Sequence, residues 1–231
     1  MNTITLLTLF LSVFFGALFV ELFKPKKQKN IQLLLTFSGA YLLAVCLIEI
    51  LPEIFHHNTQ ENIGLYILFG FFIQNILEHF SQGIEHGHSH KTHKTPFIMF
   101  LSLCIHALLE GVPLGAHLDH STHNSLLAAI ALHKIPASIV LMTFFLQNNI
   151  KKTKAYFLLL IFALMTPLGV FSNSIFQIIS IWQNEIIAIV LGILIHISTT
   201  ILFESNEGHK FSIMKLFTII VAASIVLFSS H

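Results

Sequence analysis

Charged residues are scarce in this sequence, because Asp, Glu, Lys and Arg together make up only 10% of its 231 residues. A soluble domain usually carries about 25%. Hydrophobic residues make up 55%, 23 residues are Phe, and the mean hydropathy is +0.80. The few charges lie between long apolar runs, so we predict an all-α integral membrane protein.

Cysteine is also rare, and no basic surface is evident. The only two cysteines, Cys46 and Cys104, lie inside apolar runs, which excludes a disulfide framework and a four-thiolate zinc site. The net charge of +1 argues against a nucleic-acid partner. The first residues lack a positive leader and a small-residue cleavage site, so we expect residues 3–23 to be a retained helix rather than a signal peptide.

Eight apolar segments are long enough to cross a bilayer, whose core of roughly 30 Å requires about 20 residues of helix. We predict a single transmembrane domain over residues 1–231. Its eight helices, here called segments one to eight, are predicted at about 3–23, 31–55, 62–82, 97–118, 124–147, 155–176, 184–204 and 211–229.

Lysine falls in every second link between these segments. It occurs at 24–30, 83–96, 148–154 and 209–215, whereas 56–61, 119–123 and 172–184 contain neither Lys nor Arg. By the positive-inside rule, the lysine-bearing links face the cytoplasm and both termini lie outside.

Two segments end alike. Segment two ends with Ile-Leu-Pro-Glu at 50–53 and segment seven with Ile-Leu-Phe-Glu at 201–204, and the two cross the membrane in opposite directions. An inverted repeat of segments one to three and six to eight around two central segments, a 3+2+3 arrangement, produces such a match. Coincidence is the alternative for so short a match.

The residues that indicate chemistry lie in segments four and five. His106 and Glu110 are four residues apart, so they share one face of a helix. Counted from the predicted helix ends, His106 and His133 both reach the middle of the bilayer. A carboxylate at this depth costs at least about 2.5–3.5 kcal/mol and is tolerated when it is paired or bound to metal. Two imidazoles and a carboxylate suit zinc, so we predict a metal site at His106, Glu110 and His133.

Proline and glycine lie beside these residues. Pro113 and Pro136 each leave the carbonyl four residues earlier without its helical donor, and irregular backbone at this depth must be buried or line a cavity. Gly111 and Gly115 allow a neighbouring helix to approach closely. For each residue alone, a packing kink or a hydrogen-bonded core histidine is the alternative, but their common depth favours the metal site.

Lys134 directly follows His133 and is costly as a cation near the middle of the membrane. It either forms an ion pair with Glu110 or another acid, or places its ammonium where a second metal ion would bind. The alternative is that it faces a water-filled cavity or extends to the interface.

Further polar residues lie toward the ends of the segments. We predict an entrance at Glu49 and Glu53 and an exit past Asn75, Glu78 and His79, with ordinary solvated helix ends as the alternative. His196 in segment seven either adds a ligand or is a satisfied core histidine.

Histidines are concentrated in the cytoplasmic link 83–96. Neutral imidazoles bind zinc and related ions. This loop is therefore either a metal trap or sensor on the exit side, or a solvated segment of low specificity. Its candidate residues are His86, His88, His90 and His93.

The motif His106-xxx-Glu110-Gly111, followed by His133-x-x-Pro136, resembles that of the Zrt/Irt-like (ZIP) family of divalent-metal transporters. The eight segments and the histidine-rich link extend the resemblance over nearly the whole chain. It implies uptake of zinc, or of iron, manganese or cadmium, into the cytoplasm, with the metal as substrate and no cofactor required. It also implies a binuclear site between segments four and five and an elevator-like motion of the central helices.

Three positions depart from the pattern of that family. The family usually has an acid directly after the segment-five histidine, where this chain has Lys134, and a Glu or His four positions after it, where Ala137 stands. The Asn that often follows the segment-four histidine is Ala107. These departures from the family pattern imply one metal site rather than the two that the resemblance implies, with the charge of Lys134 in place of the second ion.

We expect a transporter rather than an enzyme, integral to the plasma membrane (the inner membrane of a bacterium) and in contact with lipid. An intramembrane metal-dependent hydrolase is the alternative from the enzyme class, although the chain has no HExxH motif. A metal sensor without flux is the alternative among binding proteins. The oligomeric state is left open, with a homodimer as one alternative.

Overall fold

The computed structural model describes residues 3–23, 28–57, 62–81, 96–116, 118–176, 181–204 and 213–229. Every regular element in these ranges is a helix. In chain order they are α1 (Thr3–Phe23), α2 (Gln28–Val45), η1 (Cys46–Ile50), α3 (Leu51–His57), α4 (Ile63–Ser81), α5 (Pro96–Gly111), η3 (Val112–Gly115), α6 (His120–Gln147), α7 (Lys152–Ile175), α9 (Gln183–Glu204) and α10 (Ile213–Ser229).

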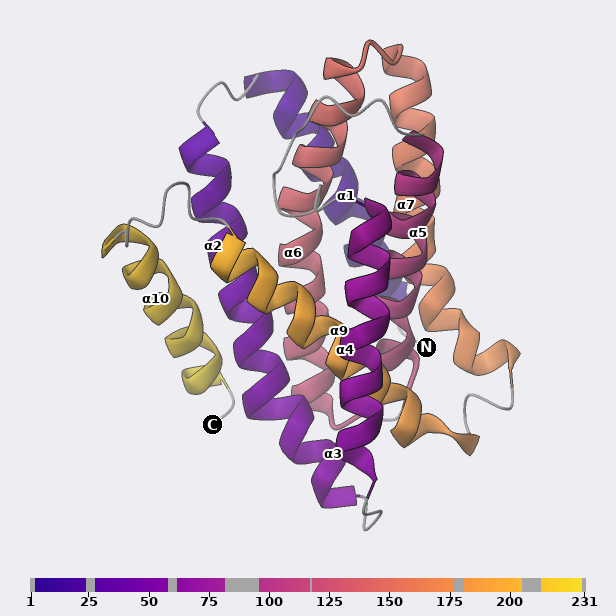
Figure 1. Cartoon of the computed structure of the whole chain (residues 1–231), viewed down its shortest axis with the longest axis vertical. Coiled ribbons are helices and arrows are strands. Elements are labelled where there is room, and N and C mark those ends of the chain that lie inside the picture. The colour runs from indigo at the N-terminus through magenta and orange to yellow at the C-terminus, as the bar shows by residue number, and fades with distance from the viewer. Residues whose placement is uncertain are drawn as a thin grey trace.

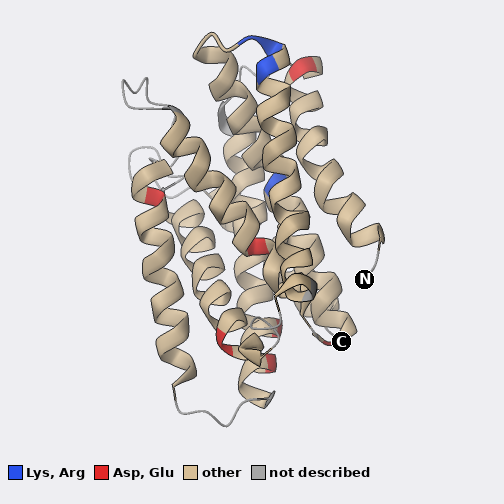
Figure 2. Cartoon of the chain, turned by 90° about the vertical axis from the view of Figure 1, so that its right-hand side faces the viewer, with Lys and Arg blue, Asp and Glu red and all other residues tan. Residues whose placement is uncertain are grey.

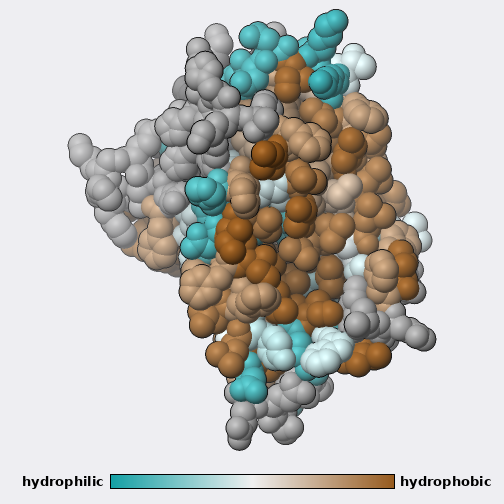
Figure 3. Space-filling model, turned by 45° about the vertical axis from the view of Figure 1, so that its right-hand side comes forward, coloured by the Kyte–Doolittle hydropathy of each residue, from teal (hydrophilic) through white to brown (hydrophobic). Residues whose placement is uncertain are grey.

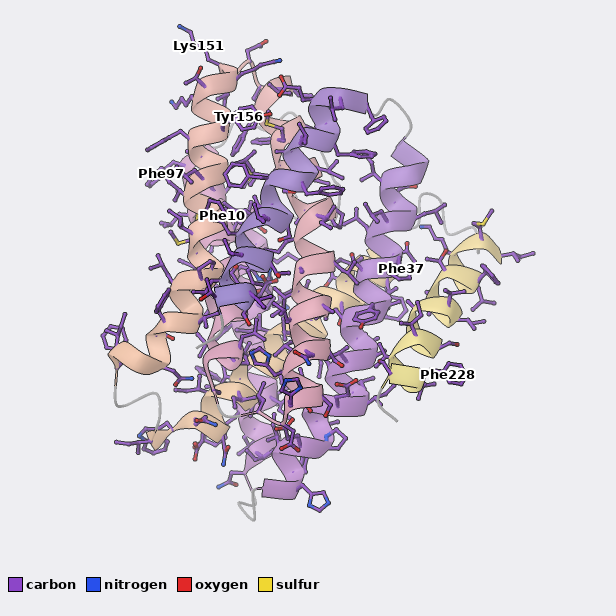
Figure 4. The ribbon with its side chains drawn as sticks, turned by 180° about the vertical axis from the view of Figure 1, so that it is seen from behind. Phe10, Phe37, Phe97, Lys151, Tyr156 and Phe228 are labelled. Carbon is purple, nitrogen blue, oxygen red and sulfur yellow. The ribbon has the colours of Figure 1, made fainter. Side chains whose placement is uncertain are left out.

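The helices are built to be surrounded by lipid. Within the described ranges, seven spans are long and apolar enough to cross a membrane, and α10 is a further apolar helix of 17 residues. Figure 3 shows hydrophobic side chains across the middle of the bundle, with hydrophilic ones toward its ends. Phe97 and Phe228 are 70% and 86% exposed and point away from the bundle (Figure 4). These features confirm the predicted all-α membrane protein, because apolar side chains face lipid at low cost while each helix satisfies its own backbone.

Several helix ends differ from the prediction. Segment two continues through the π-helical turn η1 into α3, and α-helical geometry in segment four ends at Gly111, just before the 3-10 turn that contains Pro113. Proline lacks the N–H that an α-helix requires at this point. In contrast, α6 begins at His120 and α7 at Lys152, earlier than predicted, because a helix continues past the apolar stretch that marks its membrane-embedded part.

The helices fall into two groups by their contacts. In the first group α6 packs on α1, α1 on α7, and α7 on α5; in the second, α4 packs on α9, α9 on α2, and α2 on α10 (Figure 1). The groups meet chiefly where α2 contacts α6 and where α4 contacts α5. We call the first the site group, since it includes α5 and α6, and the second the frame group.

The packing has much of the symmetry that an inverted repeat requires. An inverted repeat pairs α1 with α7, α2 with α9, α4 with α10, and α5 with α6. Under this exchange the α4–α9 contact corresponds to the α10–α2 contact, and both are present. The α1–α6 contact corresponds in the same way to the α7–α5 contact. The α2–α9 and α1–α7 contacts map onto themselves. Two contacts have no counterpart of comparable extent in the described residues: α2–α6, which would map onto α9–α5, and α4–α5, which would map onto α10–α6. The symmetry is therefore incomplete between the two groups. These pairings support the predicted 3+2+3 repeat.

Candidate metal site

The predicted ligands lie deep inside the bundle. His106 is midway along residues 96–115 and His133 is at the middle of α6. His106 and His133 are each 2% exposed, Glu110 is fully buried, and Lys134 is 1% exposed. Figure 2 shows how few charged residues lie away from the two ends of the bundle. The three predicted ligands and Lys134 are therefore shielded from both water and lipid.

Glu110 lies between the two imidazoles. Its Oε1 is 2.9 Å from His106 Nε2 and 3.7 Å from His133 Nε2, and the three residues can offer ligand atoms that all lie within 4.8 Å of one another. Bonds of 2.0–2.1 Å around a tetrahedral zinc separate neighbouring ligand atoms by ~3.3 Å, a value between the two measured distances. In the described part of the chain, this is the only cluster of three His, Cys, Asp or Glu residues close enough to hold a metal ion.

The two oxygens of Glu110 have different surroundings. Oε2 accepts a hydrogen bond of 2.5 Å from Lys134 Nζ, which also lies 4.9 Å from the centre of the Phe162 ring. Oε1 faces both imidazoles, and no donor other than these ring nitrogens lies close to it among the described residues. Lys134 thus forms the ion pair that was one of its predicted alternatives. A carboxylate oxygen and two ring nitrogens close together are ligand types that zinc binds.

A cavity adjoins the site. Ala137 lies in its wall, at the position where the ZIP family usually has a Glu or His. The lining residues are Leu103, His106, His133, Lys134, Ala137, Leu141 and Phe162. Apart from the site residues themselves the wall is apolar, so Ala137 supplies no fourth ligand.

Close packing against α7 holds the helix that carries His106 and Glu110. A methyl group added at Gly111 would lie 2.1 Å from the carbonyl oxygen of Thr166, and one at Gly115 would lie 2.2 Å from that of Val170. Thr166 Oγ1 also donates to the Ala107 carbonyl over 2.8 Å. The close approach predicted from Gly111 and Gly115 is therefore confirmed. Because Gly111 directly follows Glu110, this packing against α7 also fixes the position of Glu110.

Gln74 of α4 is a contact that the sequence analysis did not identify. Its side chain is fully buried, and its Oε1 lies 3.2 Å from His106 Nδ1. The prediction named its neighbour Asn75, which is exposed. The missed signal was the spacing of Gln74 and Glu78, which are four residues apart and share one face of an otherwise apolar helix.

The other predicted inner residues do not join the metal cluster. Glu78 Oε2 lies 3.3 Å from His196 Nδ1, and the His196 ring stands edge-on to Phe71 with centroids 4.5 Å apart. This pair links α4 to α9 and matches the alternative in which His196 is a satisfied core histidine. His79 is exposed beside Phe80.

The predicted entrance residues lie near the α3 end of the bundle. Glu49 is 8% exposed, and the Ser125 side chain of α6 lies close to its carboxylate. Glu53 Oε1 accepts a hydrogen bond of 2.9 Å from the Asp119 backbone N–H. The four loop histidines predicted to bind metal, at positions 86, 88, 90 and 93, lie outside the described residues.

The fold and the site define a class: a multi-pass helical membrane protein with a His/Glu cluster suited to a metal ion in its interior. The chain belongs to the ZIP zinc transporter family, whose model matches residues 95–229, more than half of its length. The matched region contains both helices of the cluster. Members of this family are transporters rather than enzymes.

Individual relatives are similar over part of their length. The zinc transporter ZIP9-B of Xenopus laevis is 30% identical over 122 residues, which cover 49% of this chain and 40% of the relative. The human zinc transporter ZIP1 is 23% identical over 190 residues, which cover 62% of this chain and 59% of the relative. The chain thus spans about half the length of these curated relatives.

Proposed function

We propose that this protein carries a divalent metal ion, with zinc as the preferred substrate, across the plasma membrane into the cytoplasm. Its transport site consists of His106, Glu110 and His133. The observation that carries the proposal is the meeting of His106, Glu110 and His133 in the interior of the bundle, with both imidazoles facing Oε1 of Glu110. Membership of a family of zinc transporters supports zinc as the substrate.

The inferred direction follows from the lysines. Lys151 lies at the end of the bundle opposite α3 (Figures 1 and 4). By the positive-inside rule, that end faces the cytoplasm and the α3 end faces outward. In this orientation the ion enters past Glu49 and Glu53 and leaves on the side of Glu78.

The movement we infer is a displacement of the site group relative to the frame group. All three ligands lie on α5 and α6, both in the site group. Within the frame group, α4 and α9 pack so closely that a methyl at Gly192 would lie 1.9 Å from the Ile67 carbonyl oxygen. Such packing favours a rigid frame, and an elevator-like shift of the site group would expose the ion first to one side and then to the other.

Lys134 has a specific role in this proposal. Its ammonium, held against Glu110 Oε2, takes the place of a second cation and leaves Oε1 for the transported ion. The protein would therefore carry one ion per site. The ion pair also compensates for the cost of burying the Glu110 carboxylate in the apolar interior.

The ligands can be tested by zinc uptake into proteoliposomes. We expect His106→Ala, Glu110→Ala and His133→Ala each to lower the initial rate at least about tenfold, because each removes one of three metal ligands. His120→Ala serves as the matched control, since His120 is exposed at the start of α6, and should retain near-wild-type uptake. Wild-type rates in all three ligand variants would disprove the site. Saturable zinc binding with no uptake by the wild type would instead indicate a sensor.

The proposed entrance makes a different prediction. Glu49→Gln should raise the zinc concentration needed for half-maximal uptake by roughly threefold to tenfold, with little change in maximal rate, because it removes an attractive charge but no transport ligand. Glu185→Gln is the control, as it removes a buried carboxylate from α9 at the same end of the bundle. Equal half-saturation in wild type and Glu49→Gln would remove Glu49 from the pathway.

A further inference from the structure

The contact between Gln74 and His106 joins the two helix groups at the metal site. Gln74 lies on α4 in the frame group, and His106 lies on α5 in the site group. The amide is fully buried, with Oε1 3.2 Å from His106 Nδ1. Its Nε2 has no acceptor among the described residues, so His106 is the one described group that orients the amide.

We propose that Gln74 is a positioning residue that selects the metal-binding tautomer of His106. This inference rests on the proposed transport site. A neutral imidazole carries one proton, on either Nδ1 or Nε2. His106 Nε2 is the nitrogen that faces Glu110, at 2.9 Å from Oε1, and it must be unprotonated to bind an ion. The proton then belongs on Nδ1, where it donates to the carbonyl oxygen of Gln74.

The chemistry of the glutamine side chain suits this role. Its carbonyl accepts the Nδ1 proton without bringing a net charge into the apolar interior, whereas an apolar side chain of similar size would leave both tautomers available. Such a partner typically changes metal affinity by about 10–100-fold when it is removed. Gln74 thus acts on the ion through His106, without being a ligand.

The position of Gln74 in the frame group has a consequence for release. Ser102 Oγ also donates to the Leu77 carbonyl over 2.6 Å across the same α4–α5 interface. When α5 shifts relative to α4, the amide contact ends and His106 loses its fixed tautomer. The site then binds the ion more weakly in the displaced position than in the position with the amide contact, which favours release there.

Three variants in the full-length protein test the proposal by zinc titration calorimetry and by uptake rates over a range of zinc concentrations. We expect Gln74→Leu, which removes the acceptor at similar volume, to raise the dissociation constant and half-saturation about tenfold or more. Gln74→Glu keeps an acceptor and should bind zinc at least as tightly as wild type. Ile76→Leu, at an exposed position of the same helix, is the control and should leave binding unchanged.

A positioning role and a packing role for Gln74 predict opposite changes in zinc affinity for these two substitutions. If Gln74 only fills space, Gln74→Leu retains zinc affinity and Gln74→Glu, which buries a charge, loses it; that result overturns the proposal. Failure of the proposed function is distinguishable, because the wild type itself would then neither bind nor carry zinc. Folding of each variant is checked by its elution as a single species in detergent.

Discussion

Replacing Glu110 with glutamine is expected to abolish zinc uptake and to destabilise the protein by about 3–5 kcal/mol, the usual cost of removing one partner of a buried ion pair. Lys134, beside the Phe162 ring, would lose the carboxylate that it contacts at 2.5 Å and be left buried without an ion-pair partner. The neutral amide would also be a poor ligand for a divalent ion. Thermal unfolding in detergent and uptake into proteoliposomes measure the two effects separately.

Adding a second substitution, Lys134→Met, separates the loss of stability from the loss of uptake. In the double variant Glu110→Gln with Lys134→Met, no unpaired charge remains, so stability should return close to that of the wild type, because apolar replacement of a buried pair is often neutral. Uptake should stay absent, since the ligand is still missing. Restored uptake in the double variant would show that Glu110 serves only to neutralise Lys134, and the transport site would have to be reassigned.

Gly111→Ala is expected to have a large effect on both stability and uptake, although Gly111 is not one of the proposed ligands. The new methyl would lie 2.1 Å from the carbonyl oxygen of Thr166, and main chain cannot rotate away as a side chain can. We expect α5 and α7 to be forced apart, a loss of at least about 1–3 kcal/mol of stability, and reduced uptake because Glu110 moves with its neighbour. The thermal midpoint in detergent measures the first effect.

The same substitution at Gly64 is the matched control. A methyl there meets nothing within 4 Å, so Gly64→Ala should be neutral or slightly stabilising, as alanine favours helix. If Gly111→Ala unfolds at the same temperature as Gly64→Ala, the close packing of α5 on α7 is not what holds the site in place.

Local patterns were enough to predict most of the fold. Apolar runs near 20 residues predicted the positions of eight helices, because the thickness of a bilayer dictates that length. The exact ends were harder: α6 begins at His120 and α7 at Lys152, where polar residues extend the helices beyond the apolar runs. Proline predicted irregular backbone after Gly111, and η3 is found there.

The sequence by itself determined the chemistry of the site. His106 and Glu110 share a helix face through their spacing alone, and His133 reaches the same depth because depth depends only on the count of residues from the helix end. The cost of burying a carboxylate made this trio a metal-site prediction before any contact was known. All these inferences use distances along one helix.

Only the tertiary structure decided which partners each of these residues has. Lys134 had several alternatives, and the packing of α6 against α5 placed its ammonium on Glu110 Oε2. Gln74 and its neighbour Asn75 are equally polar in sequence, yet the rotation of α4 buries one beside His106 and leaves the other exposed. Contacts between helices depend on the rotation and register of both, which the small side chains at their crossings set. That information lies in no single segment.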